Sequence, residues 1–312
     1  MDRKKADPMK HCVALILLSL FPLTLSAEHL FEIGLRAGMA GYDARYHYVL
    51  SVTDLHAGGL LSYAYHSDHV IGFRVAATLD RHQAGFGREG FTDSYSVIDV
   101  ENEPIQVDYS IGRLQEMYTT WSFGLPVQLA LSTNHFAFYL GPKFVFPFSC
   151  RWSEKADQAA LSVYFPLQDN RVYHSFPLAA SPSFQESQAG DFRMLPKVQY
   201  VLAAEACYDI AIHTGHRSKS YLSIGIYFDY SFSAIQDEPS DRISLLMISD
   251  TRDGFPLHRI MTPVVNAQRQ GKRLVASRKP FDLGFKLSYR IAPYDPHQET
   301  YRACHCYGNG YF

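Results

Sequence analysis

The C-terminal tail is the stretch of this sequence whose residue types best suit metal or thiol chemistry. Cys304, His305 and Cys306 offer two thiols and an imidazole, a donor set that suits a soft metal ion. A structural zinc site needs a further ligand, and none is spaced nearby. In an oxidising compartment a disulfide is the more favoured fate. A bond from Cys207 to Cys304 or Cys306 is one alternative, and free or mutually linked tail cysteines are the other. We therefore expect no metal site.

Motifs of nucleophilic or phosphate chemistry are absent from the sequence. It contains no Gly-x-Ser-x-Gly, no His-Glu-x-x-His and no glycine-rich phosphate-binding loop. His174 beside Ser175, and His258, are of the types that a lipid-modifying enzyme uses, but no partner residue is placed near them. We expect no catalytic residues, no cofactor and no enzymatic activity, with a lipid-modifying enzyme as the less favoured alternative.

A third group of residues consists of charged side chains that lie on the alternate, polar positions of otherwise apolar segments. Carboxylates and cations occur in near balance, so they can neutralise one another in pairs. The members of this predicted charge network are Glu32, Arg36, Arg74, Asp80, Lys143, Glu205, Asp209, Asp229, Asp282, Lys286 and Arg290.

The segments that carry these charges alternate with period two. In 278–291, apolar or aromatic residues such as Phe281 and Phe285 occupy one parity, and small or charged residues such as Asp282 and Lys286 occupy the other. In a β-strand this pattern places one face against hydrocarbon or a core and the other in a polar space. Seven further segments alternate in the same way, namely 30–40, 55–65, 70–81, 115–131, 135–148, 197–212 and 221–232.

The connections between these eight predicted strands alternate between long and short. The predicted long loops are 41–53, 81–114, 150–196 and 233–277, and within the second of them 95–107 is expected to form a hairpin. Long loops on one side and short turns on the other are typical of transmembrane barrels, whose strands need about 9 to 11 residues to cross the bilayer. A soluble β-sandwich or lipocalin-like barrel is the alternative, but a sandwich gives no reason for this alternation. We predict an all-β fold, an eight-stranded antiparallel up-and-down transmembrane β-barrel with long extracellular loops. Its narrow interior would be filled by the paired charges.

The two ends of the chain fall outside the predicted barrel. Basic residues, the apolar run 13–25 and Ala27 are typical of a secretory signal peptide over residues 1–27, with translation starting at Met1 or Met9. The barrel is assigned to 28–292 and a periplasmic C-terminal tail to 293–312. No later stretch is long and apolar enough for a transmembrane helix.

The overall composition is near neutral and rich in aromatic residues. Lys and Arg total 29 against 31 Asp and Glu, a balance that argues against a nucleic-acid partner. Aromatic residues make up 14% of the chain, which suits β-strands and the aromatic girdles of membrane barrels.

Three segments carry a resemblance to a known family: FEIGLRAG near the start, FAFYLGPKFVFPF in the middle and KPFDLGFKLSYRI at the end. The chain resembles the small outer-membrane β-barrel proteins of the OmpA/OmpX-like "porin family" of Gram-negative bacteria. It departs from them by continuing from Ala292 to Phe312 beyond the last strand. The resemblance implies a place in the outer membrane, with bilayer lipids and the barrel-assembly machinery as partners. It also implies a structural role, or binding of an unidentified extracellular ligand through the long loops, with a small or gated porin-like channel as the alternative.

Overall fold

The computed structural model describes residues 27–46, 48–67, 71–98, 102–133, 135–167, 169–173, 184–191, 198–214, 218–235, 245–249, 258–261, 263–269 and 272–293. Of the predicted signal peptide (1–27) and tail (293–312), residues 1–26 and 294–312 lie outside them, while Ala27 and Pro293 are end residues of strands. None of the described segments is a helix of the length and hydropathy that crossing a membrane requires.

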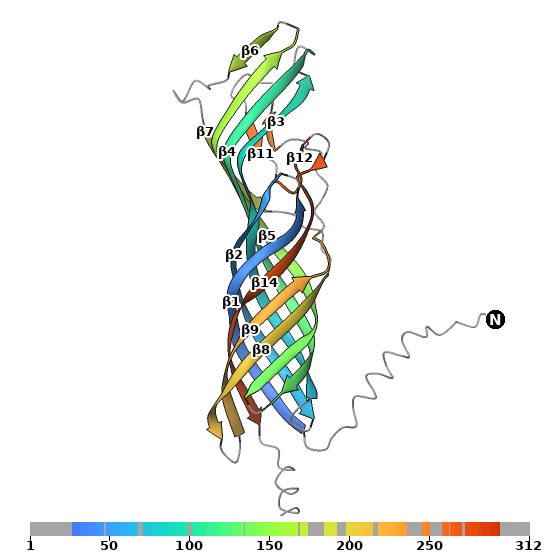
Figure 1. The fold of residues 1–312 in the computed structure, drawn as a ribbon, viewed down its shortest axis with the longest axis vertical. Coiled ribbons are helices and arrows are strands. Elements are labelled where there is room, and N and C mark those ends of the chain that lie inside the picture. Colours follow the sequence, from blue (N-terminus) through green and yellow to red (C-terminus); the bar gives the residue numbers. More distant parts are fainter. Residues whose placement is uncertain are drawn as a thin grey trace, which may run out of the picture.

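Eight strands pair antiparallel into a closed ring (Figure 1). The ring order is β4-β3-β2-β1-β14-β9-β8-β5, and the pairing of β4 with β5 completes it. The predicted eight-stranded antiparallel barrel is therefore confirmed, and each predicted strand segment falls almost wholly within one strand of the ring. These strands are β1 (Ala27–Tyr46), β2 (Leu50–Ser67), β3 (Ile71–Ile98), β4 (Pro104–Ser132), β5 (Phe136–Phe165), β8 (Gln199–Thr214), β9 (Ser218–Ser231) and β14 (Val275–Pro293).

The alternation in the sequence becomes an apolar outer face and a polar inner face. Leu35 and Leu287 are paired across β1 and β14 and point outward, with 69% and 51% of their surface exposed. The next pair, Arg36 and Lys286, points inward and is almost fully buried. Exposed large apolar side chains continue around the ring in 31–39, 50–61, 71–79, 121–131, 136–148, 198–212, 224–232 and 283–291. Nine residues of a strand tilted by about 40° rise by roughly 23 Å, close to the height of the apolar band of membrane barrels.

Three connections that are short in sequence lie at one end of the barrel, where the described chain also begins and ends (Figure 1). They join Ser67 to Ile71, Ser132 to Phe136 and Thr214 to Ser218. These are the short turns that the sequence predicts, and all three lie at the lower end in Figure 1.

The opposite end differs from the prediction, because most of the predicted loops are strand. β1 runs to Tyr46 and β2 starts at Leu50, so the loop predicted for 41–53 is a short connection. β3, β4 and β5 run on well beyond their partners in the ring and form an extended sheet (Figure 1). The hairpin expected at 95–107 is present, with Tyr95 opposite Val107. In the loop predicted for 150–196, β6 (Asn170–Tyr173) and β7 (Phe184–Asp191) both pair with β5.

The last predicted loop, 233–277, is also structured. It contains two short antiparallel pairs, β10 (Leu246–Ser249) with β11 (His258–Met261), and β12 (Gln268–Arg269) with β13 (Lys272–Arg273). Its buried residues Leu245, Val264, Val265, Ala267 and Leu274 join one hydrophobic cluster with the extended sheet. Burial of these side chains stabilises the packing of the segment on the strands, by roughly 1.5–3 kcal/mol for each large side chain.

We call this upper part the cap. It comprises β3 from residue 84, β4 up to residue 118, β5 from residue 150, and the described residues between 245 and 275. The members of its core include Phe86, Phe91, Val107, Tyr109, Ile111, Leu114, Tyr118, Trp152, Ala156 and Val163. The main hydrophobic core of the molecule therefore lies in the cap, while the inside of the barrel below it is polar.

Candidate functional site

All members of the predicted charge network lie on inward-facing positions of the barrel wall. They come from β1, β3, β5, β8, β9 and β14. The side chains of Asp209 and Asp282 are each 15% exposed. The buried members are Glu32, Arg36, Arg74, Asp80, Lys143, Glu205, Asp229, Lys286 and Arg290.

The lower layer of the network is built around two carboxylates, Glu32 and Glu205. Lys286 Nζ lies 2.9 Å from Glu32 Oε1 and 2.6 Å from Glu205 Oε2. Arg74 bridges the same pair, at 3.1 Å from Glu32 Oε2 and 2.6 Å from Glu205 Oε2. Arg290 Nε adds a third cation 3.4 Å from Glu32 Oε1. Each carboxylate is thus shared between cations, and an ion pair out of water requires such partners because desolvation of each charge costs several kcal/mol.

Neutral polar side chains complete this layer. Ser62 Oγ donates to Glu32 Oε2 at 2.8 Å and accepts from Arg74 Nε at 3.0 Å. Gln128 Oε1 accepts from Arg74 Nη1 at 3.2 Å. Because Ser62 is on β2 and Gln128 on β4, every strand of the ring contributes to the network. Toward the short-turn end, Arg290 Nη1 donates to both carboxylate oxygens of Asp209, at 2.8 and 2.7 Å.

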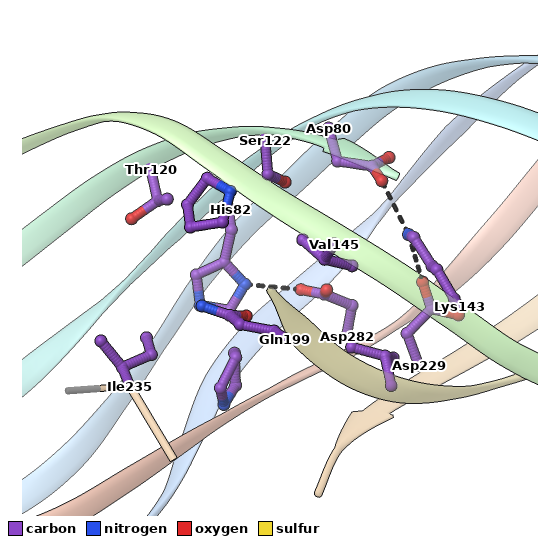
Figure 2. Close-up of a pocket in the computed structure, with 13 residues that line it drawn as sticks. Asp80, His82, Thr120, Ser122, Lys143, Val145, Gln199, Asp229, Ile235 and Asp282 are labelled. Carbon is purple, nitrogen blue, oxygen red and sulfur yellow. Dashed lines mark hydrogen bonds and ion pairs between the residues drawn. The ribbon is translucent and has the colours of Figure 1, made fainter. Parts of the chain in front are cut away.

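The upper layer joins β1, β3, β5 and β9. Lys143 Nζ lies 2.7 Å from Asp80 Oδ2 and 2.8 Å from Asp229 Oδ2 (Figure 2). Arg36 Nη2 lies 2.7 Å from the same oxygen of Asp229, and Thr78 Oγ1 donates to Asp80 at 2.7 Å. The two carboxylates therefore hold two cations between them, in the same sharing pattern as the lower layer.

Two histidines belong to the network, although the sequence analysis did not include them. Asp282 lies 2.8 Å from His82 Nδ1 (Figure 2), so its partner is an imidazole rather than one of the predicted cations. His56 Nδ1 lies 2.6 Å from the hydroxyl of Tyr227, and His56 Nε2 lies 3.5 Å from Asp80. The period-two alternation could have identified His82, because it follows Asp80 by two residues and therefore lies on the same face of the strand.

Tyrosine rings support the cations from the side. The Tyr139 ring centroid lies 4.5 Å from the Arg74 guanidinium carbon, 5.3 Å from that of Arg290 and 5.5 Å from Lys286 Nζ. The ring of Tyr227 lies 3.9 Å from the Arg36 guanidinium carbon. Such contacts contribute about 0.5–2 kcal/mol each, the larger value applying where the cation is desolvated. The tyrosines thus fill space between the ion pairs and attract the same cations.

Glycines on the inner face make room for the charged side chains. A Cβ atom at Gly124 would lie 2.6 Å from Lys143 Cε and would also collide with Thr78. At Gly58 a Cβ would collide with the Asp80 carboxylate. Larger residues at these two positions would displace members of the upper layer.

A small cavity lies directly above the upper layer. It has a volume of about 40 Å³ and is lined by Asp80, Lys143, Asp229, His82 and Ser122, among others (Figure 2). This is room for about three water molecules. The space is small enough that side chains, not solvent, occupy most of the barrel interior at this level.

The other residues singled out in the sequence do not assemble into a site. Cys207 is buried in β8 and forms no disulfide, while its predicted partners Cys304 and Cys306 lie outside the described residues. His174 and Ser175 also lie outside them, and His258 pairs with Ser249 in β10–β11. Within the described residues, no group of three His, Cys, Asp or Glu side chains is placed to hold a metal ion.

Comparisons with known proteins give structural neighbours of low similarity. No protein-family model matches the sequence, and no curated protein matches it. Among solved structures, the chain is similar to Ail, the attachment invasion locus protein of Yersinia pestis, in complex with the heparin analogue sucrose octasulfate. The identity is 11% and the TM-score 0.27, over 85% of this chain and 99% of Ail. A second structure of Ail gives 12% identity, a TM-score of 0.26 and the same coverage. Similarity at this level shows neither the family nor the function.

Proposed function

We propose that this protein is an integral outer-membrane β-barrel whose interior is closed by its own ion pairs and whose cap faces the outside of the cell. The proposal rests on the distribution of side chains in the barrel, which is the reverse of that in soluble proteins. Apolar side chains such as Leu35 and Phe285 are 69% and 72% exposed, while Arg36, Arg74 and Lys286 are almost fully buried. A continuous exposed apolar band of this size is unfavourable in water and suits a bilayer.

The filled interior favours a structural or surface-binding role over a channel. Two layers of ion pairs link strands that are not neighbours in the ring, such as β1 with β9 and β3 with β8. A conducting pore needs a continuous water-filled path, and charges of both signs held at 2.6–2.9 Å obstruct one. The porin-like channel is therefore the second candidate, and no described residue arrangement favours it.

The cap is the part that we assign to recognition. It has its own hydrophobic core, so the strands and segments it displays are held in place, and binding residues commonly sit on such supported loops. The partners of the proposed function are bilayer lipids around the apolar band, the machinery that inserts barrels, and an extracellular ligand bound by the cap. No residue in the described cap forms a catalytic constellation, and we propose no enzymatic activity.

Two measurements test this function. Fractionation of cells should recover the mature chain in the outer membrane, and recovery as a soluble periplasmic monomer would contradict the proposal. Purified protein in planar bilayers should show no steady conductance. A large, steady conductance would instead establish the channel and show that the ion pairs open. The two outcomes are independent, so the membrane location can hold even if the closed interior does not.

A further inference from the structure

Two glutamates face each other inside the cap. Glu116 on β4 and Glu154 on β5 are directly paired in the strand register, and both side chains point into the core. Glu116 is fully buried, and Glu154 retains 2% of its surface. Side chains directly opposite on neighbouring antiparallel strands have Cβ atoms about 4.5–5.5 Å apart. Two carboxyl groups thus lie on adjacent strands, buried from solvent.

The surroundings of the pair are mostly apolar. Neighbouring inward positions on the two strands are Leu114, Tyr118, Trp152 and Ala156, all in the cap core. Both carboxyl oxygens of Glu154 are buried and have no hydrogen-bond partner among the described residues. An ionised carboxylate in this position would lack any compensating donor, and a buried charge of that kind is strongly unfavourable.

Glu116 connects the pair to the segment around Val264, which packs on the sheet of the cap and which we call the covering segment. Its Oε2 accepts a hydrogen bond of 2.7 Å from the backbone N–H of Val264. Val264, Val265 and Ala267 are fully or almost fully buried against the sheet. The position of the covering segment is therefore coupled to the state of the two carboxyl groups.

Among the residues that the structure describes, the other titratable groups near the pair come from β4, β5 and β14. The Arg278 guanidinium on β14 is buried. Its carbon lies 4.4 Å from the ring centroid of Tyr118 on β4 and 5.3 Å from the ring centroid of Tyr42 on β1. Cys150 lies on the same face of β5 as Glu154. The inward residues of β3 at this level, Ala84 and Phe86, do not ionise, and neither do the buried residues of the covering segment.

Burial, and then the neighbouring Glu116, raise the pKa of Glu154 well above its ordinary value of 4.5. Two like charges sharing one apolar site cannot both ionise at ordinary cost. The closed cap therefore binds a proton that an opened cap releases. By linkage, stability of the closed form is independent of this group at acid pH and falls as the pH rises from about 4.5 through the raised pKa.

We propose that Glu116 and Glu154 form a proton-dependent latch for the cap. While Glu154 is protonated, the pair stays buried and Val264 stays docked on Glu116. When both carboxyl groups ionise, the covering segment separates from the sheet and water reaches the core. The inference concerns the cap alone and does not depend on whether the barrel conducts or what the cap binds.

Trp152 gives a direct optical test, because it lies two residues from Glu154 in the cap core and is 8% exposed. The chain has two tryptophans, and the other, Trp121, faces outward from the barrel. In a Trp121→Phe background, acrylamide quenching of Trp152 is measured in detergent micelles from pH 4 to pH 10. Quenching should increase with pH, since loss of one proton changes the open fraction by up to about tenfold per pH unit.

Two matched variants separate the latch from a general pH effect. Glu154→Gln keeps the shape of the protonated acid, so quenching of Trp152 should stay low at every pH. Glu89→Gln removes an exposed carboxyl group from β3 and should behave like the parent. Heat-dependent gel mobility at neutral pH shows that each variant has a folded barrel. The latch would be wrong if quenching of Trp152 in the parent were constant across the pH range, or if Glu154→Gln followed the parent curve. If Glu154→Gln failed to fold, the titration of the parent and of Glu116→Gln would still test the latch.

Discussion

Individual residues in the barrel interior show how buried charge is tolerated in a narrow lumen. Each carboxylate in the two layers contacts more than one cation or hydroxyl, and Tyr139 offers its ring to three cations. The sequence predicts on which face each charge lies, because strand parity fixes the face. It does not predict which charges meet, because Arg74 and Glu205 are 131 positions apart and come together only through the barrel register.

Arg74 is the residue whose loss should be most damaging. Arg74→Ala would leave Glu32 and Glu205 buried with fewer cations, and breaking a buried ion pair costs about 3–5 kcal/mol. We expect a lower midpoint in denaturant-induced unfolding in micelles, and leak currents in planar bilayers. Lys155→Ala is the matched control, since Lys155 is a 52% exposed cation whose pairing with Asp157 should contribute at most about 1 kcal/mol. Equal midpoints for the two variants would contradict the structural importance of the network.

The strands show where sequence reasoning succeeded and where it stopped. All eight ring strands follow from alternation with period two, but most residues of the cap strands lie in predicted loops. Three neighbouring strands are irregular at the same level, where the pairs of Gly90 with Gly112 and of Gly112 with Gln158 are missing from an otherwise continuous register. Gly90 and Gln158 have positive φ values of 64° and 54°.

On these strands the parity that faces inward changes at this level, although the pairing register on either side is unchanged. On β4 the inward side chains change from Leu114 and Glu116 on even positions to Tyr109 and Ile111 on odd positions, with Gly112 between them.

A register shift lies between Trp121 and Ser122 on β4, and across it the inward residues of β5 change from Lys143 and Val145 to Cys150 and Trp152. A single period of two does not extend across this shift, so the predicted strand in β5 ends at Phe148. Glu116 lies within the predicted strand 115–131 on the parity that faces inward, whereas Glu154 lies in the predicted loop 150–196, beyond this register shift.

The closing pair of strands offers a test at the level of elements. Leu35 on β1 lies opposite Leu287 on β14, and residues directly opposite are within the Cα separation that a disulfide accepts, about 4.4–6.8 Å. In a background without the native cysteines, Leu35→Cys with Leu287→Cys should crosslink under mild oxidation and keep the compact form on heating. Leu35→Cys with Phe285→Cys is offset by two residues and should crosslink poorly. Efficient crosslinking of the offset pair alone would mean a different closing register.

One continuous sheet forms both parts of the molecule, but its apolar face points outward in the barrel and inward in the cap. In the barrel the outer face is apolar and the inner face charged, while in the cap Arg113, Lys155 and Gln115 face outward and the core is apolar. The change occurs along single strands, near Trp121 on β4 and Phe148 on β5. This position fits the outer boundary of a bilayer, where the surroundings of the wall change from hydrocarbon to water. In the proposed membrane location, the lower part would lie in the bilayer, while the cap packs its apolar side chains inward as a soluble protein does.

This arrangement predicts which end of the barrel faces the cell exterior. A short epitope inserted after Asn102, in the exposed turn at the tip of the cap, should be detected by antibody on intact cells. The same epitope inserted after Thr133, in the exposed short turn between β4 and β5, should be detected only after the outer membrane is permeabilised. Both insertions lie at exposed turns where added residues are tolerated, so expression and heat-dependent gel mobility should match the parent. Detection of the Thr133 insertion alone on intact cells would place the cap in the periplasm and reverse the proposed orientation, and with it the assignment of the cap to extracellular recognition.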